Sequence, residues 1–158
     1  MNETVILTQP EVRQLLPMRD CMDLMAATLR SLAGGAGTNP LRGAMWLPDK
    51  RGLIGMMPGM SGEPEALGLK VVAVFPGNHG THLDSHQGVV ILFDPDNGVP
   101  LAIVDASEVT AIRTAAVGGM VTELLARDDA SVVAMLGTGV QARTHLEAMA
   151  EARGLTEV

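Results

Sequence analysis

The sequence predicts an α/β protein in two parts: an α+β domain over residues 1–127 and the beginning of a second α/β domain over residues 128–158. Three observations predict this organisation. Short apolar segments separated by turn residues follow one another in the middle of the chain, as in an antiparallel sheet. A long stretch with helical apolar spacing comes next. An apolar run, a glycine-containing turn and another helical stretch close the chain, as in one βα unit.

The first part of the chain predicts one strand and two helices. Residues 4–7 form the expected strand. Thr8 and Glu11 have the spacing of a capping box, so a helix should follow them and end at Pro17. Asp20 is expected to cap a second helix, which a glycine-rich segment ends.

The middle of the chain predicts a sheet of mainly antiparallel strands. The expected strands are residues 42–47, 53–57, 67–75, 88–93 and 100–104. Turns are expected at 49–52 and 94–98, and loops at 58–64 and 76–85. The segment LGLKVVAVF is almost continuously apolar, so this strand should be covered on both faces.

The long helix is expected over residues 106–126. Asp105 and Glu108 form a capping pair at its start, and Val109, Ile112 and Ala116 lie on its apolar face. Residues 127–130 link this helix to the next strand, so the boundary between the two domains is expected there.

The last part of the chain has the pattern of a dinucleotide-binding turn. Residues 132–136 predict a buried parallel strand, and a helical repeat follows with Ala142, His145, Leu146, Met149 and Ala152 on one face. The turn between them consists of Gly137, Thr138, Gly139, Val140, Gln141 and Ala142. Strand, G-x-G-x-x-A turn and helix together are typical of a Rossmann-like site, where the helix N-terminus binds the pyrophosphate of NAD or NADP. An ordinary βα turn is the alternative interpretation.

The turn lies at the front of its domain. A residue that contacts the adenosine ribose is expected roughly 20 residues further along a Rossmann-like fold, and the sequence ends at Val158. The chain should therefore contain the first βα unit of a nucleotide-binding domain and not the rest of that domain.

Composition argues against several classes of protein. The formal net charge is −7, no basic block is present, and aromatic residues make up 2%, which argues against nucleic acid and anionic membranes as partners. No apolar run is long enough to span a membrane, and no secretory leader is recognisable. The single cysteine, Cys21, is expected to be a buried thiol in a reducing compartment, which favours the cytoplasm.

Three cations occur at positions where a negative partner is expected. Arg113 falls among apolar positions of the long helix, and a buried guanidinium needs an anion such as a carboxylate. Lys70 lies in the middle of the apolar strand, although an edge-strand lysine that prevents aggregation is the alternative. Arg42 begins a strand, where it could equally be a solvated charge.

The expected loop at residues 76–85 and the two residues that follow it contain three of the four histidines: His79, His82 and His86. Their spacing matches no regular metal-ligand pattern, so no metal site is predicted.

The order of motifs resembles the ornithine cyclodeaminase/mu-crystallin family. The motifs are NPLRGAMWLP, MMPGM, LGLKVVAVFPGN, SHQGVVILFDPDNGVPLAIVDA, EVTAIRTAAV and LGTGVQARTHLEAM. The resemblance covers nearly all of this chain but about the first half of a typical member. It implies a substrate-binding and dimerisation domain followed by a Rossmann domain, in a homodimer joined through the N-terminal sheets.

The resemblance also implies roles for particular residues. Arg42, Lys70 and Arg113 would bind the substrate carboxylate, Met57 would lie close to the substrate, and the turn at 137–142 would bind the cofactor. The catalytic acid or base is expected beyond residue 158.

The activity that the resemblance implies is conversion of L-ornithine to L-proline and ammonia, with NAD taking and returning a hydride. Two alternatives remain. One is an alanine dehydrogenase or a ketimine or pyrroline-carboxylate reductase of the same family. The other is a truncated, non-catalytic protein that binds a small ligand as a dimer. In each case the expected ligand is a small amino or imino acid.

Overall fold

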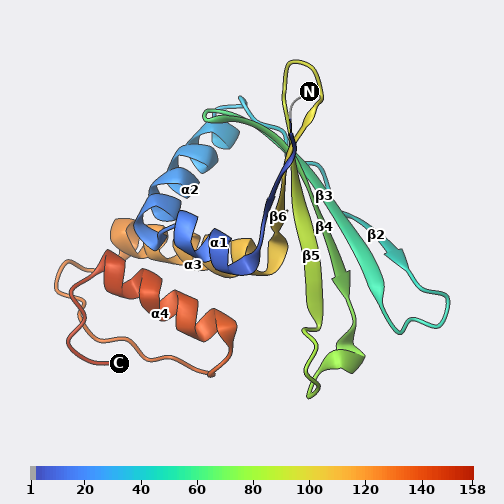
Figure 1. Ribbon diagram of the computed structural model, residues 1–158. Helices are drawn as coiled ribbons and strands as arrows, with labels where there is room; N and C mark the ends of the chain where they lie inside the picture. The colour runs from blue at the N-terminus through green and yellow to red at the C-terminus, as the bar shows by residue number, and fades with distance from the viewer. Residues whose placement is uncertain (1–2) are drawn as a thin grey trace.

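The structure is a computed structural model that describes residues 3–158 (Figure 1). Its elements, in chain order, are β1 (Val5–Leu7), α1 (Gln9–Leu15), α2 (Met18–Ala33), β2 (Gly43–Trp46), β3 (Leu53–Gly62), β4 (Glu65–Val74), the 3₁₀ turn η1 (Pro76–Asn78), β5 (His86–Phe93), β6 (Pro100–Asp105), α3 (Ala106–Leu125) and α4 (Val140–Ala152).

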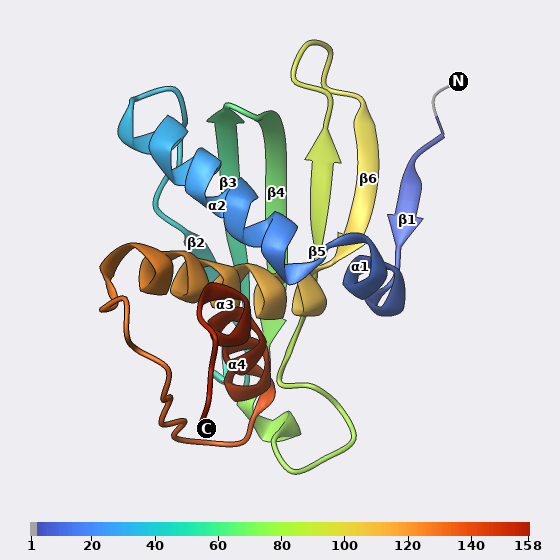
Figure 2. The ribbon, with the colours of Figure 1, turned by 90° about the vertical axis from the view of Figure 1, so that its left-hand side faces the viewer.

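A six-stranded sheet with helices on one face forms the body of the protein. The strand order is β1-β6-β5-β4-β3-β2, and only β1, which pairs with β6, runs parallel to its neighbour. Figures 1 and 2 show α1, α2 and α3 on the same side of the sheet, with α4 packed outside α3. The predicted mixed α/β class is confirmed, whereas the division at residue 127 stays a prediction.

The apolar core lies mainly between helices. Buried residues of α2, α3 and α4 form one cluster: Cys21, Met22, Ile112, Ala116, Met120 and Ala152. The Cys21 side chain is 1% exposed, as expected, and this burial raises the pKa of its thiol. Among the helices of residues 3–158, none is long and apolar enough to cross a membrane.

The helix starts agree only in part with the sequence predictions. The Thr8 N–H donates to the Glu11 carboxylate at 2.8 Å, which confirms the capping box of α1. The Asp105 carboxylate accepts from the Glu108 N–H at 2.8 Å and caps α3. Asp20, in contrast, caps nothing: α2 begins at Met18, with Pro17 as the residue before it. Pro17 occupies the N-cap position with φ −58° and ψ 148°. Its side chain cannot accept a hydrogen bond, so the helix begins without a polar cap.

The predicted loop at residues 58–64 is wrong. β3 continues to Gly62 and pairs with β4 as far as Glu65. Pro58, Gly59 and Gly62 are poor strand formers, but pairing with β4 overrides this local preference. A Cβ on Gly62 would lie 2.3 Å from the Ala36 carbonyl oxygen, so this glycine permits a close approach of the chain after α2.

The predicted buried strand at residues 132–136 is also wrong. Val132 makes only an isolated parallel bridge with Glu157, and the Val132 and Leu136 side chains are 63% and 93% exposed. A buried parallel strand needs neighbours on both sides and cover on both faces. Within residues 3–158 the segment at Glu157 supplies one short neighbour, so the run stays extended and open.

Candidate functional site

Lys70 lies inside the sheet, on the face that carries the helices. β4 has β5 and β3 as neighbours, so the alternative of an edge-strand lysine is excluded. The half-buried side chain reaches across to α3, where its Nζ donates a hydrogen bond to Thr110 Oγ1 at 2.6 Å. The ammonium is therefore held between β4 and α3.

Two arginines bring further positive charge to the same place. Burial lowers the pKa of Lys70, and the charges of Arg113 and Arg42 lower it further. Among residues 3–158, no salt bridge involves any of these three cations. Positive charge gathered without a carboxylate partner is the electrostatic condition for binding an anion.

The prediction that Arg113 is buried is wrong, because its side chain is exposed. α3 is apolar on more than one side, so the positions around Arg113 did not define a single buried face. Arg113 and Thr110 are three residues apart and so share a face of α3, the face that meets Lys70. Arg42 is also exposed and precedes β2.

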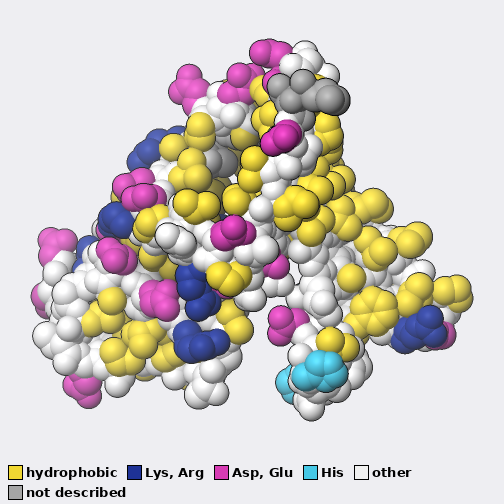
Figure 3. Space-filling view, viewed as in Figure 1, with side chains coloured by type: hydrophobic (Ala, Val, Ile, Leu, Met, Phe, Trp, Pro, Cys, Tyr) yellow, Lys and Arg dark blue, Asp and Glu magenta, His cyan; other side chains and the backbone are white. Residues whose placement is uncertain are grey.

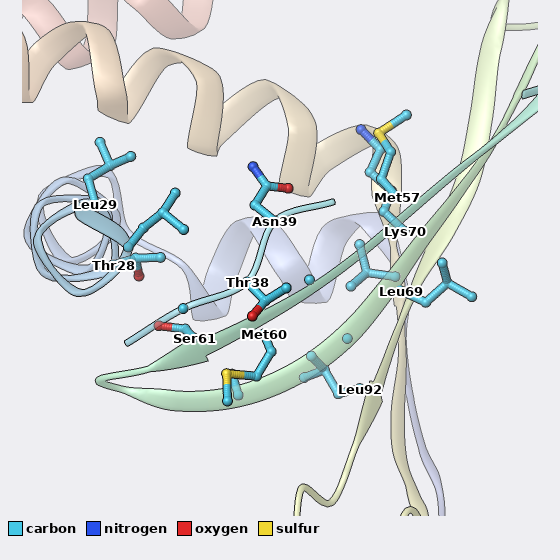
Figure 4. Close-up of a pocket in the computed structure, with 16 residues that line it drawn as sticks. Thr28, Leu29, Thr38, Asn39, Met57, Met60, Ser61, Leu69, Lys70 and Leu92 are labelled. Carbon is cyan, nitrogen blue, oxygen red and sulfur yellow. The ribbon is translucent and has the colours of Figure 1, made fainter. Parts of the chain in front are cut away.

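A groove leads away from this cation cluster. Its volume is about 370 Å³, and Met57, which lies opposite Lys70 in the β3–β4 ladder, lines it beside the lysine (Figure 4). The other lining residues labelled in Figure 4 are Thr28, Leu29, Thr38, Asn39, Met60, Ser61, Leu69 and Leu92. The lining is mainly apolar, and one end is cationic. This arrangement suits a small carboxylate with an aliphatic body.

Sequence reasoning missed two parts of this site. The groove wall from α2, at Thr28 and Leu29, depends on how the helix crosses the sheet, and no local pattern predicts that. Thr110 carried a usable signal, since it precedes Arg113 by three residues and a helix places both on one face.

The glycine turn before α4 is open and positioned to meet an anion. Gly137 has φ +109°, which favours glycine, and Gly139 is the N-cap of α4, which has no side-chain cap. A Cβ on either glycine would meet nothing within 4 Å. The first-turn N–H groups after Gly139, at Val140 and Gln141, are therefore free of a capping side chain, and the turn fits a pyrophosphate.

The other residues of the turn have ordinary positions. Thr138, Val140 and Gln141 are exposed and Ala142 is half-buried. α4 buries Thr144, Ala148 and Ala152. The predicted face of α4 is correct, because Ala152 is buried, the other four positions are half-buried, and His145 and Met149 lie against Gly118 of α3.

His79, His82 and His86 do not form a metal site. Within residues 3–158, no three His, Cys, Asp or Glu side chains come together in a way that could hold a metal ion.

Comparison with known proteins decides the family. The model of the ornithine cyclodeaminase/mu-crystallin family matches residues 2–158. The chain belongs to this family. Ketimine reductase mu-crystallin of Mus musculus is 40% identical over 124 residues, which cover 78% of this chain and 40% of the relative.

Two solved structures of the family's fold superpose on most of the chain. The Thermococcus litoralis Δ1-pyrroline-2-carboxylate reductase, in complex with NADH and L-proline, matches with TM-score 0.90 and 34% identity over 96% of this chain and 47% of that chain. An archaeal alanine dehydrogenase dimer with bound NAD matches with TM-score 0.88 and 34% identity over 96% and 46%. The chain therefore spans about half the length of these relatives.

Proposed function

We propose that this chain is the substrate-binding part of an NAD(P)-dependent reductase that acts on a small α-imino acid, of the ketimine or pyrroline-carboxylate type. One observation carries the proposal: Lys70 lines one end of an apolar groove, Arg113 and Arg42 add positive charge to it, and no salt bridge among residues 3–158 neutralises the three. An α-carboxylate supplies the missing negative charge. The aliphatic carbons of the imino acid would occupy the groove beside Met57.

The roles of the residues follow from their chemistry. Lys70 and the two arginines bind the carboxylate and so fix the α-carbon, and fixing a reacting atom in this way accelerates a reaction by lowering its entropic cost. Met57 limits the space next to the lysine. The open turn at residues 137–142 holds the pyrophosphate of NAD or NADP. When bound, the nicotinamide cofactor supplies the hydride chemistry.

Cyclodeamination of L-ornithine to L-proline is the second candidate. The same cation cluster would bind the carboxylate of ornithine, and the family includes this activity in its name. The mainly apolar lining of the groove favours the imino acid, because the terminal ammonium of ornithine needs a polar or anionic partner.

We further propose a homodimer that forms through the uncovered face of the sheet. Met56, Val71 and Val89 are cross-strand neighbours on the face opposite Lys70. Met56 and Val89 are 42% and 36% exposed, and Figure 3 shows hydrophobic side chains gathered over this side of the sheet. A contiguous apolar surface of this kind marks a protein interface.

The dimer has a direct test. Met56→Glu should convert a dimer into a monomer, measured as molar mass by light scattering, because it places a charge in the interface. Leu125→Glu, at an exposed position at the end of α3, should leave the mass unchanged. Equal masses for Met56→Glu and the unchanged protein would refute this interface.

We also propose a cytoplasmic location, which the single buried thiol of Cys21 supports.

The activity is tested with the complete enzyme that contains this substrate-binding part, incubated with 1-pyrroline-2-carboxylate and NADH or NADPH. Steady consumption of reduced cofactor is the expected result. Proline formation from ornithine with NAD⁺, without net change in NADH, would instead support the second candidate. Retained carboxylate binding with neither activity would indicate a ligand-binding protein.

Binding is measured separately by calorimetry with pyrrole-2-carboxylate, a planar analogue of the cyclic imine. Lys70→Met should weaken binding by about 10- to 100-fold, since hydrogen bonds from a charged donor are lost. Lys50→Asn is the matched control. It removes the only other lysine, which lies in an exposed turn. Equal affinities for both variants would refute the carboxylate site.

A further inference from the structure

One hydroxyl group joins the cation cluster to α3. Thr110 Oγ1 accepts a hydrogen bond from Lys70 Nζ at 2.6 Å and donates its own hydrogen to the Ala106 carbonyl oxygen at 2.5 Å. These contacts connect the middle of β4 to the first turns of α3. Thr110 is half-buried, so little water competes for either bond.

The direction of the bonds follows from the number of hydrogens available. A hydroxyl has one hydrogen, and that of Thr110 is used on Ala106, the residue four positions earlier in the helix. Thr110 can therefore offer Lys70 only a lone pair, and Lys70 must be the donor. An ammonium has three N–H groups. One points to Thr110, and two remain for another acceptor.

Electrostatic repulsion makes such an anchor necessary. The charged groups that act on Lys70 are Arg113 from α3 and Arg42 from the segment before β2, and both repel the ammonium. The lysine side chain has four rotatable bonds, so a free ammonium would move away from the arginines towards solvent. The bond to Thr110 opposes that movement.

We propose that Thr110 is a positioning residue that holds the Lys70 ammonium near the two arginines, with two of its N–H groups directed at the bound carboxylate. This inference rests on the proposed function, because it assigns the acceptor of those two N–H groups to the substrate. Each of these N–H groups can donate a charge-assisted hydrogen bond to a carboxylate oxygen. Without Thr110, the cation remains in the protein but is no longer fixed at the end of the groove.

The first experiment follows Lys70 itself and requires no ligand. The chain contains two lysines, so protein labelled with [¹³Cε]lysine gives two side-chain signals, and Lys50 in its exposed turn serves as the reference. The Lys70 signal is titrated with pH in the unchanged protein and in Thr110→Val, Thr110→Ser and Thr114→Val. Thr114 is the matched control: it lies one turn further along α3, and its hydroxyl has no hydrogen-bond partner among residues 3–158.

Thr110→Val should move the Lys70 signal and lower the pKa of Lys70 further, because an acceptor that stabilises the charged form is lost. Thr110→Ser keeps the hydroxyl, so the position of the Lys70 signal and the pKa of Lys70 should match those of the unchanged protein. Thr114→Val should leave both unchanged. An unchanged Lys70 titration in Thr110→Val, or an equal change in Thr114→Val, would overturn the proposal. Thr110→Ala provides the same test if the valine variant does not fold.

The second experiment measures pyrrole-2-carboxylate affinity in the same variants. Thr110→Val should weaken binding by about tenfold, and Thr110→Ser should bind like the unchanged protein. If the unchanged protein binds no carboxylate, the proposed function fails while the Lys70 titration still reports the bond to Thr110. If binding is normal in every variant, the positioning role fails and the proposed function stands.

Discussion

Gly88 provides a sharp test of how closely β5 and β4 pack beside Lys70. In Gly88→Ala, the new Cβ would lie 2.1 Å from the Val71 carbonyl oxygen and 2.9 Å from Val72 Cα. Backbone atoms of a central strand cannot rotate away, so β4 must shift by roughly 1 Å to relieve the overlap. Overpacking of a tight core costs about 1–3 kcal/mol, and a contact with backbone belongs at the upper end.

Alanine also lowers the conformational entropy of the unfolded chain, which stabilises the folded protein by about 0.4–1 kcal/mol. The expected net loss in the free energy of unfolding is therefore about 2–2.6 kcal/mol, or about 4–10 °C in Tm for a chain of this size. Urea and thermal unfolding followed by circular dichroism measure both quantities. Gly77→Ala is the matched control, because its Cβ would meet nothing within 4 Å. If Gly88→Ala unfolds at the same urea concentration as Gly77→Ala, β5 and β4 do not pack this closely.

Three further predictions concern ionisable groups. The folded-state pKa of Lys70 is below its ordinary value of 10.5, so its charge destabilises the fold at neutral pH, and Lys70→Met should unfold at higher urea than the unchanged protein at pH 7. That difference should shrink as pH rises through the lowered pKa towards 10.5, and a constant difference would contradict it. Hydrogen bonding from Arg19 lowers the pKa of Glu123 below its ordinary value of 4.5. The stability that the Glu123 carboxylate contributes should therefore be lost as pH falls below 4.5, and Glu123→Gln should flatten this part of the plot of unfolding free energy against pH. Arg153 donates to three carbonyl oxygens at the end of α3 at 3.1–3.3 Å, so Arg153→Ala should speed amide hydrogen exchange in α4 by about tenfold, whereas Arg143→Ala, at an exposed position of α4, should not.

Local patterns predicted most of the elements correctly. The capping residues Thr8 and Asp105 mark the starts of α1 and α3, and the apolar run around Lys70 is a central strand. These features depend on neighbours within a few residues, which the sequence displays directly. The strand through Pro58 and the open segment at Val132 were predicted wrongly, because pairing partners far along the chain decide whether a segment becomes a strand.

The sequence by itself determined which residues could form a site. A lysine in an apolar strand, an arginine among apolar helix positions and glycines at the helix start of α4 are unusual enough to be selected from composition and spacing alone. The order of the motifs also indicated the family that comparison confirmed.

Only the tertiary structure decided how these residues meet. It placed Arg113 in the open and not in the core, joined Lys70 to α3 through Thr110, and formed the groove beside Met57 from α2 and the sheet. The contact between Lys70 and Thr110, for example, links residues forty positions apart. Their geometry depends on how the helices cross the sheet, and no periodicity within one segment contains that information.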